Sequence, residues 1–256
     1  MVRNNCPLCS SENTMNLLRA DNWEIAFCMH CSNGWTEPPP VKIRYDEEDF
    51  HSQFWYREVD DLPTQWKKAT MMQADLLTKF LKPGSKILEI GCGEGIFLKE
   101  LRRRGFKVTG IEPSARASQR ARDAGLDVIC GCFPESRIKG PFSAVVAIQV
   151  LEHIAHPQAF LKEVQDVAAG GFALFVQTNW RGLVPRLQKR RWYAWVPEQH
   201  FWHFTPKGIA VLFRKVHWRI LKLEFSSLHH GGSLISKLGA VIPGFGDQFH
   251  VLAKIP

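Results

Sequence analysis

Between residues 67 and 254 the chain alternates short apolar runs with segments whose apolar side chains recur at helical spacing. The runs that we predict to be strands are 87–90, 106–111, 126–130, 142–149, 172–178, 217–225 and 247–254. The segments that we predict to be helices are 67–82, 96–104, 114–125, 157–170 and 206–215. Helices that separate apolar strands indicate a parallel sheet covered on both faces. The pattern therefore predicts an α/β fold.

Local signals place several helix ends. Ser114 and Thr205 precede helical segments, and their hydroxyl groups can accept a hydrogen bond from the first turn. Pro206 suits the first helical position. Pro83 and Gly84 end the first helix and lead into the first strand of the sheet.

A glycine-rich turn links that strand to its helix. Residues 86–95 are Lys-Ile-Leu-Glu-Ile-Gly-Cys-Gly-Glu-Gly. Glycines let backbone N–H groups approach a ligand that a Cβ atom would push away. Strand, glycine turn and helix in this order are typical of nucleotide-binding α/β folds. Glycine turns also occur as simple connections between a strand and a helix, so the turn alone does not establish a nucleotide site.

Glu112 supplies a second signal. It ends the next apolar run, about 20 residues past the turn, where doubly wound folds bind a ribose diol. A carboxylate accepts two hydrogen bonds from a diol and repels a 2′-phosphate. The dinucleotide pattern G-x-G-x-x-G would need glycine at position 96, where this chain has Ile96. The spacing therefore disfavours a dehydrogenase.

Glu89, the glycine turn and Glu112 together resemble the signature of class I S-adenosylmethionine-dependent methyltransferases, and the similarity covers about residues 70–215. The stretch Gln-Val-Leu-Glu-His-Ile at 149–154 resembles a branch that includes ubiquinone-pathway and sugar O-methyltransferases. The resemblance implies a Rossmann-like, mostly parallel sheet of seven strands whose last strand runs antiparallel. It also implies that S-adenosylmethionine is held by Glu89, Gly91, Cys92, Gly93, Gly95, Glu112, Pro113, Cys132, Phe133, Gln149 and Val150.

Two departures from the family's pattern affect this site. Cys132 stands where relatives often have an acid near the adenine amino group, so backbone or neighbouring groups are expected to hold the adenine. Ser143 replaces an aspartate that is common at the start of the fourth strand.

The first 36 residues contain two C-x2-C pairs, Cys6 with Cys9 and Cys28 with Cys31, separated by eighteen residues. This spacing is typical of a tetrahedral four-thiolate metal site. Four thiolates leave no open coordination position, so we predict structural Zn²⁺. Iron in a rubredoxin-like site is the chemical alternative.

A run of three prolines at 38–40 marks a boundary. We predict a zinc-ribbon-like unit over 1–40 and a methyltransferase domain over 41–256. Residues 41–66 mix acids with aromatic side chains and could form either a lid over the substrate or a strap packed on the domain.

Residues 180–204, here called the basic insert, carry five cationic side chains beside four tryptophans. The insert follows the fifth strand and should emerge at the carboxyl edge of the sheet, where ligands bind. We predict a mobile cover that admits an anionic or amphiphilic acceptor and makes peripheral contact with a membrane. The alternative is a rigid loop whose tryptophans pack on the core.

The net charge of +8 permits an anionic small molecule, a nucleic acid or an acidic membrane, but does not choose among them. No apolar run approaches the ~20 residues of a membrane span. The start lacks the apolar core of a signal peptide, so a cytoplasmic protein is expected. The remaining cysteines, Cys92, Cys130 and Cys132, are expected to be thiols.

Methyl transfer to a hydroxyl group requires alignment of the acceptor and removal of its proton. His153, just past the fourth strand, and His200, before the last long helix, are the candidate catalytic bases. For each, a packed or capping imidazole is the alternative. Simple alignment without a protein base is a further alternative.

The predicted function is O-methylation of a small molecule, such as a glycan-pathway sugar or a quinone or lipid precursor. One alternative is an RNA methyltransferase that uses the zinc-ribbon-like unit for recognition and whose basic insert contacts phosphate. Another is a non-catalytic module that binds S-adenosylmethionine. Enzymes that methylate exocyclic base amines commonly carry Asn/Asp-Pro-Pro-Tyr/Phe after the fourth strand. This chain has Gln-Val-Leu-Glu there, which argues against methylation of exocyclic base amines but not of other RNA positions. Nucleic acid is the less favoured acceptor.

Overall fold

The computed structural model describes residues 5–20, 23–40, 58–135, 138–227 and 244–256. Most of the predicted lid or strap, residues 41–57, lies outside these residues. Its described end forms a 3-10 turn, η1 (Val59–Asp61), and the start of α2 (Thr64–Thr78).

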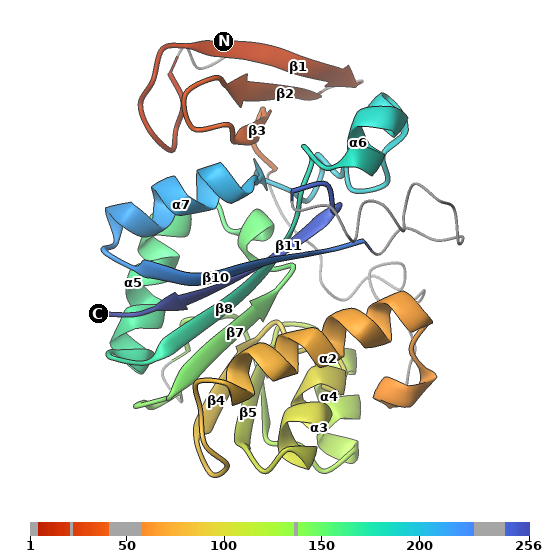
Figure 1. Cartoon of the computed structure of the whole chain (residues 1–256), viewed down its shortest axis with the longest axis vertical. Coiled ribbons are helices and arrows are strands. Elements are labelled where there is room, and N and C mark those ends of the chain that lie inside the picture. The colour runs from red at the N-terminus through yellow and green to blue at the C-terminus, as the bar shows by residue number, and fades with distance from the viewer. Residues whose placement is uncertain (1–4, 21–22, 41–57, 136–137, 228–243) are drawn as a thin grey trace. The chain divides into compact units, whose positions relative to one another are not determined.

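The described strands of the main sheet lie in the order β10-β11-β8-β7-β4-β5-β6 (Figure 1). Their bounds are β4 (Lys86–Ile90), β5 (Lys107–Glu112), β6 (Val128–Cys130), β7 (Ala144–Ile148), β8 (Phe172–Thr178), β10 (Arg219–Ser226) and β11 (Gln248–Lys254). β4 pairs in parallel with β5 and with β7, and β5 pairs in parallel with β6. β11, the last strand, runs antiparallel. The predicted Rossmann-like sheet is therefore confirmed.

The remaining helices are α3 (Ile96–Arg103), α4 (Ala115–Asp123), α5 (Pro157–Ala168), α6 (Leu183–Gln188) and α7 (Pro206–Lys215), with 3-10 turns η2 (Leu151–His153) and η3 (Lys189–Arg191). The predicted helices among them are present in the predicted order, and the basic insert adds one helix, α6, that was not predicted. Both predicted caps are present. The Ser114 hydroxyl accepts from the Ala117 N–H at 3.2 Å, and that of Thr205 accepts from the Gly208 N–H at 3.1 Å. α2 ends at Thr78 rather than at residue 82. Pro83 disfavours helical conformation at Lys82, the last residue of the predicted helix.

The chain divides into two compact units. Unit 1 comprises 1–43, 149–160 and 176–251, and unit 2 comprises 44–148, 161–175 and 252–256. In unit 2, buried side chains from α2, α3 and the strands form one apolar core. Its fully or nearly buried members are Ala74, Leu76, Leu77, Ile87, Phe97, Leu101, Phe106, Ala144, Val146, Leu174 and Leu252. Each large aliphatic side chain buried here stabilises the fold by about 1.5–3 kcal/mol.

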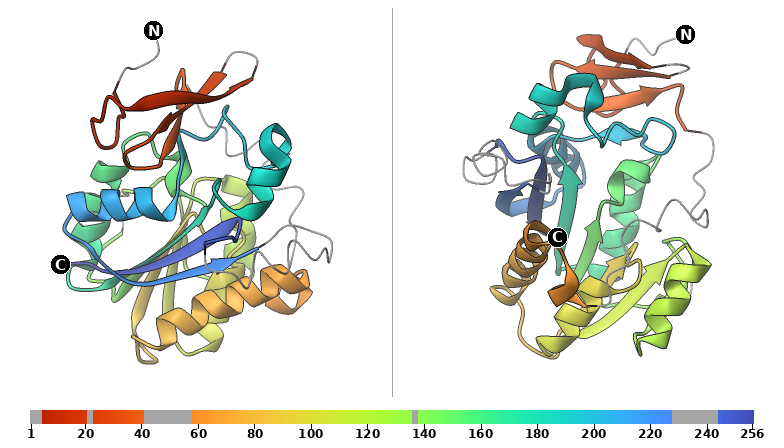
Figure 2. Two further views of the ribbon diagram at one scale, coloured as in Figure 1. Left: turned by 45° about the horizontal axis from the view of Figure 1, so that its top comes forward. Right: turned by 90° about the vertical axis from the view of Figure 1, so that its right-hand side faces the viewer.

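Unit 1 contains a second sheet, which is antiparallel. Its order is β1-β2-β3-β9, formed by β1 (Thr14–Ala20), β2 (Trp23–Cys28), β3 (Gly34–Glu37) and β9 (Trp202–His203). Figure 2 shows the β1–β2 hairpin from two sides. β9 comes from the basic insert, so this segment completes the sheet of the four-cysteine unit.

Candidate functional site

The glycine turn at the end of β4 offers an open backbone surface in unit 2. Gly91, Gly93 and Gly95 have φ values of 70°, 53° and 79°, a conformation that L side chains rarely adopt. A Cβ atom at Gly93 would meet no atom within 4 Å, whereas one at Gly95 would lie 2.2 Å from Leu126 Cδ1. Gly95 therefore allows close packing, and Gly93 leaves room for a ligand.

Glu112, at the end of β5, is buried and bonded to the turn. Its carboxylate accepts the N–H of Gly93 and the N–H of Ser114, both at 2.9 Å. These contacts fix the carboxylate beside the glycine turn. Glu94 of the turn is also anchored, by an ion pair of 2.7 Å with Arg120 on α4.

Glu89 lies near the end of β4 and is 3% exposed. Burial and then the charge of Glu112 raise its pKa well above the usual value, and a backbone hydrogen bond from Leu98 opposes this shift. One carboxyl oxygen, Oε2, has no hydrogen-bond partner among the described residues. A buried carboxyl group in this state is suited to a cationic ligand.

These features fit S-adenosylmethionine. Its amino acid moiety carries an ammonium group that would suit Glu89 beside the open glycine turn, and its ribose diol would suit Glu112. When bound, this cofactor supplies an activated methyl group and its own leaving group. The chain would supply the surface that holds it.

Other predicted cofactor residues lie around this surface or in unit 1. Cys92 is buried in the turn, and burial, followed by the charges of Glu89 and Glu112, raises its pKa. Cys132 is exposed, but its thiol is partly shielded from water, and this desolvation, followed by the charge of Glu112, raises the pKa of the thiol. Pro113 follows β5, and Phe133 follows β6.

Gln149 and Val150 follow β7 and belong to unit 1. The N–H of Gln149 donates to the Val176 carbonyl at 2.9 Å, and its backbone has a φ of 54°. Its side-chain Nε2 is buried without a hydrogen-bond partner in the part of the chain that the structure describes. Such an amide could donate to a ligand.

The two predicted catalytic histidines lie together in unit 1. The rings of His153 and His200 meet edge to face, with centroids 4.8 Å apart. Nδ1 of His153 lies 3.2 Å from the Gln199 carbonyl. A carbonyl only accepts, so Nδ1 carries the proton and Nε2 is the acceptor nitrogen of the neutral ring.

Burial sets the protonation of this cluster. It lowers the pKa of His153 to about 4 and that of His200 well below the usual value, with the charges of His153 and His203 adding to the second shift. Both imidazoles are therefore neutral at pH 7. Burial raises the pKa of the adjacent Glu152 to about 7.

Glu152 was not among the predicted site residues, although it stands next to His153 in the stretch that carried the resemblance. It is 2% exposed. Ligand atoms of Glu152, His153 and His200 lie within 4.8 Å of one another, close enough to share a cation.

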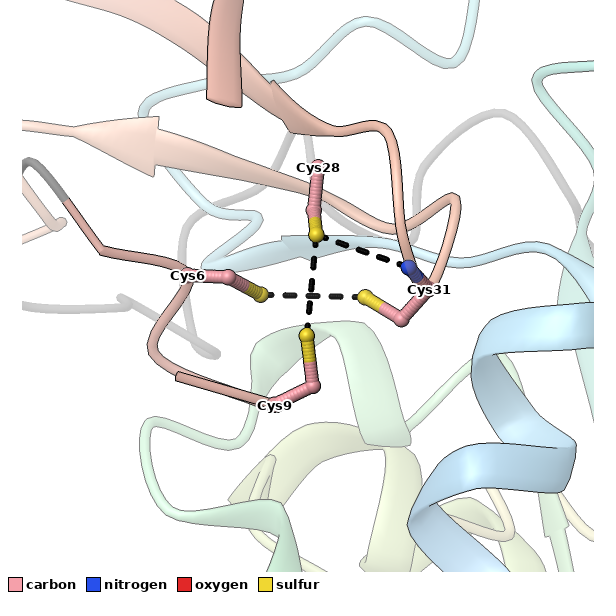
Figure 3. A group of neighbouring side chains, drawn as sticks. All are labelled: Cys6, Cys9, Cys28 and Cys31. Atoms are coloured by element: carbon pink, nitrogen blue, oxygen red, sulfur yellow. Dashed lines mark hydrogen bonds between the residues drawn. The ribbon is translucent and has the colours of Figure 1, made fainter. Parts of the chain in front are cut away.

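The four cysteines of the N-terminal unit converge as predicted (Figure 3). Sγ of Cys6 lies 3.7 Å from Sγ of Cys31, and Sγ of Cys9 lies 3.6 Å from Sγ of Cys28. A tetrahedral site with Zn–S bonds of about 2.3 Å requires sulfur atoms about 3.8 Å apart. The four thiols therefore fit a structural metal ion.

The two cysteine pairs have matching backbone turns. Ser10 and Ser32 each follow the second cysteine of a pair, with φ values of 63° and 64°. Each donates its N–H to the carbonyl of the first cysteine, Ser10 to Cys6 at 2.8 Å and Ser32 to Cys28 at 2.9 Å. Two equal turns that face each other are the arrangement that a four-thiolate site needs.

The basic insert folds partly on itself. Trp192 is 2% exposed and packs with Val184 and Ala194. A pocket of about 670 Å³ lies alongside. Its lining residues are Trp180, Pro185, Arg186, Leu187, Gln188, Lys189, Arg190, Arg191 and Trp195. The pocket thus combines aromatic and apolar walls with four cationic side chains.

None of the helices within the described residues is both long enough and apolar enough to cross a membrane.

The strand order, the glycine turn and the position of Glu112 together define a class I methyltransferase architecture. Residues 63–223 match the family model described as "Methyltransferase domain". This match covers more than half of the chain, and the chain therefore belongs to that family.

Curated relatives share part of their length with this chain. The ubiquinone biosynthesis O-methyltransferase of Caulobacter vibrioides is 32% identical over 134 residues, which cover 46% of this chain and 52% of that protein. The protein of the same name from Escherichia coli strain HS is 31% identical over 135 residues, covering 49% and 53%. The chain thus spans about half the length of these relatives.

Solved structures share the fold. A methyltransferase of Thermotoga maritima, described as a possible histamine N-methyltransferase, is 18% identical with a TM-score of 0.55, covering 73% of this chain and 89% of that chain. Magnesium protoporphyrin IX methyltransferase of Synechocystis, solved with bound S-adenosylmethionine, is 14% identical with a TM-score of 0.52, covering 74% and 79%.

Proposed function

We propose that this chain transfers a methyl group from S-adenosylmethionine to an oxygen of a small hydroxylated acceptor. The observation that carries the proposal is the buried pair His153 and His200. Nδ1 of His153 is bonded to the Gln199 carbonyl, so Nε2 carries no proton, and an unprotonated imidazole nitrogen can remove the proton of a hydroxyl group. The names of the curated relatives, ubiquinone biosynthesis O-methyltransferases, agree with this chemistry.

The favoured acceptors are quinone or lipid precursors, with glycan-pathway sugars second. The pocket of the basic insert supports the first choice, because its tryptophans suit an apolar chain and its arginines suit an anionic group. Peripheral contact with an anionic membrane would bring such an acceptor to the protein. Zn²⁺ in the four-cysteine site is proposed to be structural, because four thiolates leave no position for a substrate.

A methyl-transfer assay tests the proposal. Purified protein is incubated with S-adenosylmethionine and one of four acceptors: a catechol with a long apolar chain, the same catechol without it, a sugar, or a structured RNA. We expect formation of S-adenosylhomocysteine with the long-chain catechol and weaker formation with the short one. Methylation of RNA alone would overturn the proposal in favour of the nucleic-acid alternative.

Matched histidine variants test the role of the cluster. His153→Ala should lower kcat by about 100-fold or more, the range of general-base catalysis. His156→Ala is the control, because this exposed histidine lies only three residues further along the chain. Equal activity in both variants would show that His153 is not the base.

A further inference from the structure

The four-cysteine unit shares a sheet with the segment that carries His200 and His203. β3 pairs antiparallel with β9, and Gly34 faces His203 while Trp35 faces Trp202. A Cβ atom at position 34 would lie 3.2 Å from His203 Cβ, so glycine here permits the close approach. The unit is therefore bonded directly to the histidine segment.

Thr36 of β3 makes three hydrogen bonds to this segment. Its hydroxyl donates to the His200 carbonyl at 2.7 Å, and its N–H donates to the Phe201 carbonyl at 3.1 Å. Its hydroxyl also lies 3.1 Å from His203 Nε2. Thr36 is 2% exposed, so water does not compete for these bonds.

The hydroxyl of Thr36 fixes the tautomer of His203. A hydroxyl group has one proton, and that of Thr36 is used on the His200 carbonyl. The hydroxyl oxygen must therefore accept from His203, which places the ring proton on Nε2. His203 in turn lies 6.0 Å from His200 between ring centroids.

The same segment is tied to the rest of the histidine cluster. The N–H of Phe201 donates to the Glu152 carbonyl at 2.8 Å, and the His200 ring contacts the His153 ring. Asn33, three residues before Thr36, accepts the N–H of Thr205 at 3.2 Å. A shift of β3 would therefore be transmitted to both candidate bases.

We propose that Thr36, carried by the four-cysteine unit, is a positioning residue that holds His200 and His203 in the arrangement used for methyl transfer. The proposal rests on the proposed function. It gives the four-cysteine unit a role in building the histidine cluster, rather than a role in recognising a separate partner. Thr36 itself takes no part in proton transfer.

Three variants of the full-length protein test the role of the hydroxyl group. Thr36→Val keeps the shape and removes the hydroxyl, Thr36→Ser restores it, and Ser226→Ala removes a hydroxyl that contacts a different histidine, His250, at 2.7 Å. We expect Thr36→Val to lower kcat about tenfold, the effect of one lost hydrogen bond. The KM of Thr36→Val for S-adenosylmethionine should equal that of the wild type. Thr36→Ser should recover the wild-type kcat, and Ser226→Ala should have the wild-type kcat.

A second readout is independent of the acceptor. Long-range ¹H–¹⁵N NMR of the histidine rings should show Nε2 of His203 protonated in the wild type and a mixture of tautomers in Thr36→Val. If Thr36→Val does not fold, Thr36→Cys replaces it, because a thiol of similar size is a weaker donor and acceptor.

The outcomes separate the two proposals. Unchanged kcat in Thr36→Val, or an unchanged His203 tautomer, would overturn the positioning role. Failure of the wild type to methylate any acceptor would instead overturn the proposed function, while the NMR result would still decide whether Thr36 sets the tautomer.

Discussion

Glu89 and Glu112 lie on adjacent parallel strands and are equally buried, yet their carboxyl groups are held differently. Glu112 accepts two backbone N–H groups. Glu89 keeps one oxygen without a hydrogen-bond partner among the described residues, and its pKa is raised. Glu112 is therefore a fixed carboxylate that can accept hydrogen bonds from a neutral diol. Glu89 is a carboxyl group whose ionised form a bound cation would stabilise.

We predict that S-adenosylmethionine binding releases protons from Glu89. Burial and the charge of Glu112 raise the pKa of Glu89 in the free protein. A cation beside Glu89 would lower this pKa again, so the complex holds fewer protons and the affinity should rise with pH. Calorimetry in two buffers with different ionisation enthalpies measures the release.

The matched variants for this prediction are Glu89→Gln and Glu163→Gln. Glu89→Gln should abolish the buffer dependence, whereas Glu163→Gln, an exposed residue on α5, should keep it. Binding heats that do not depend on the buffer in the wild type would contradict the prediction.

Replacing Glu112 with Ala should weaken binding of S-adenosylmethionine by roughly 1.5–3 kcal/mol, the scale of hydrogen bonds to a charged group. The loss also leaves the N–H groups of Gly93 and Ser114 without this acceptor. Glu112→Gln keeps one acceptor oxygen, so its affinity for S-adenosylmethionine should lie between that of the wild type and that of Glu112→Ala. Titration calorimetry checks the order, and equal affinities for all three proteins would refute it.

Gly95→Ala should destabilise the protein more than Gly84→Ala. Both glycines have positive φ, 79° and 86°, which costs alanine about 1–2 kcal/mol. Only at Gly95 would the new Cβ meet another atom, Leu126 Cδ1 at 2.2 Å, whereas at Gly84 nothing lies within 4 Å. Denaturant unfolding gives the free energy of unfolding of each variant, and the difference between the two variants is the cost of the contact with Leu126. Similar decreases in both variants would show that Leu126 moves away without cost.

The metal prediction can be checked by elemental analysis. We expect about one zinc ion per chain. Cys6→Ser combined with Cys9→Ser should lose the metal, because it removes half of the ligands. Cys130→Ser combined with Cys132→Ser should retain it. Iron in the purified protein would favour the rubredoxin-like alternative, and disulfides among the four cysteines would exclude a metal role.

The basic insert is predicted to bind anionic membranes. Wild-type protein should co-float with anionic liposomes at low salt and dissociate at high salt, because the Debye length falls from about 10 Å at 0.1 M to about 3 Å at 1 M. A variant in which the cationic residues of the pocket become serine should not float. The residues changed are Arg186, Lys189, Arg190 and Arg191.

A control for this experiment removes the same charge from unit 2. Its exposed lysines Lys79, Lys82, Lys107 and Lys162 become serine. This variant should still float. If the wild-type protein remains in the liposome-free fraction at low salt, membrane contact is ruled out. Tight, salt-sensitive binding to structured RNA would favour the nucleic-acid alternative.

Local patterns predicted most of the main fold. The strand 172–178 was placed at its observed bounds, and the caps Ser114 and Thr205 act as expected. The two C-x2-C pairs predicted a four-thiol cluster, because ligand spacing is itself a local property. Each of these signals lies within a short stretch of sequence.

Contacts between distant segments were not predictable in this way. The pairing of β3 with β9 follows no periodicity, because β9 has only two residues, Trp202 and His203. The role of Thr36 depends on that pairing. Glu152 could have been noted beside His153, but its burial depends on the folded surroundings.

The hydrogen bond between Thr36 and His203 joins positions 167 residues apart. At a synthesis rate of roughly 5–20 residues per second, β9 leaves the ribosome roughly 10–30 s after β3. During this interval the β1–β2 hairpin and the cysteine turns can form from local contacts, while β3 presents an unpaired edge. The histidine cluster is therefore completed late in biosynthesis, after the cysteine unit that supports it.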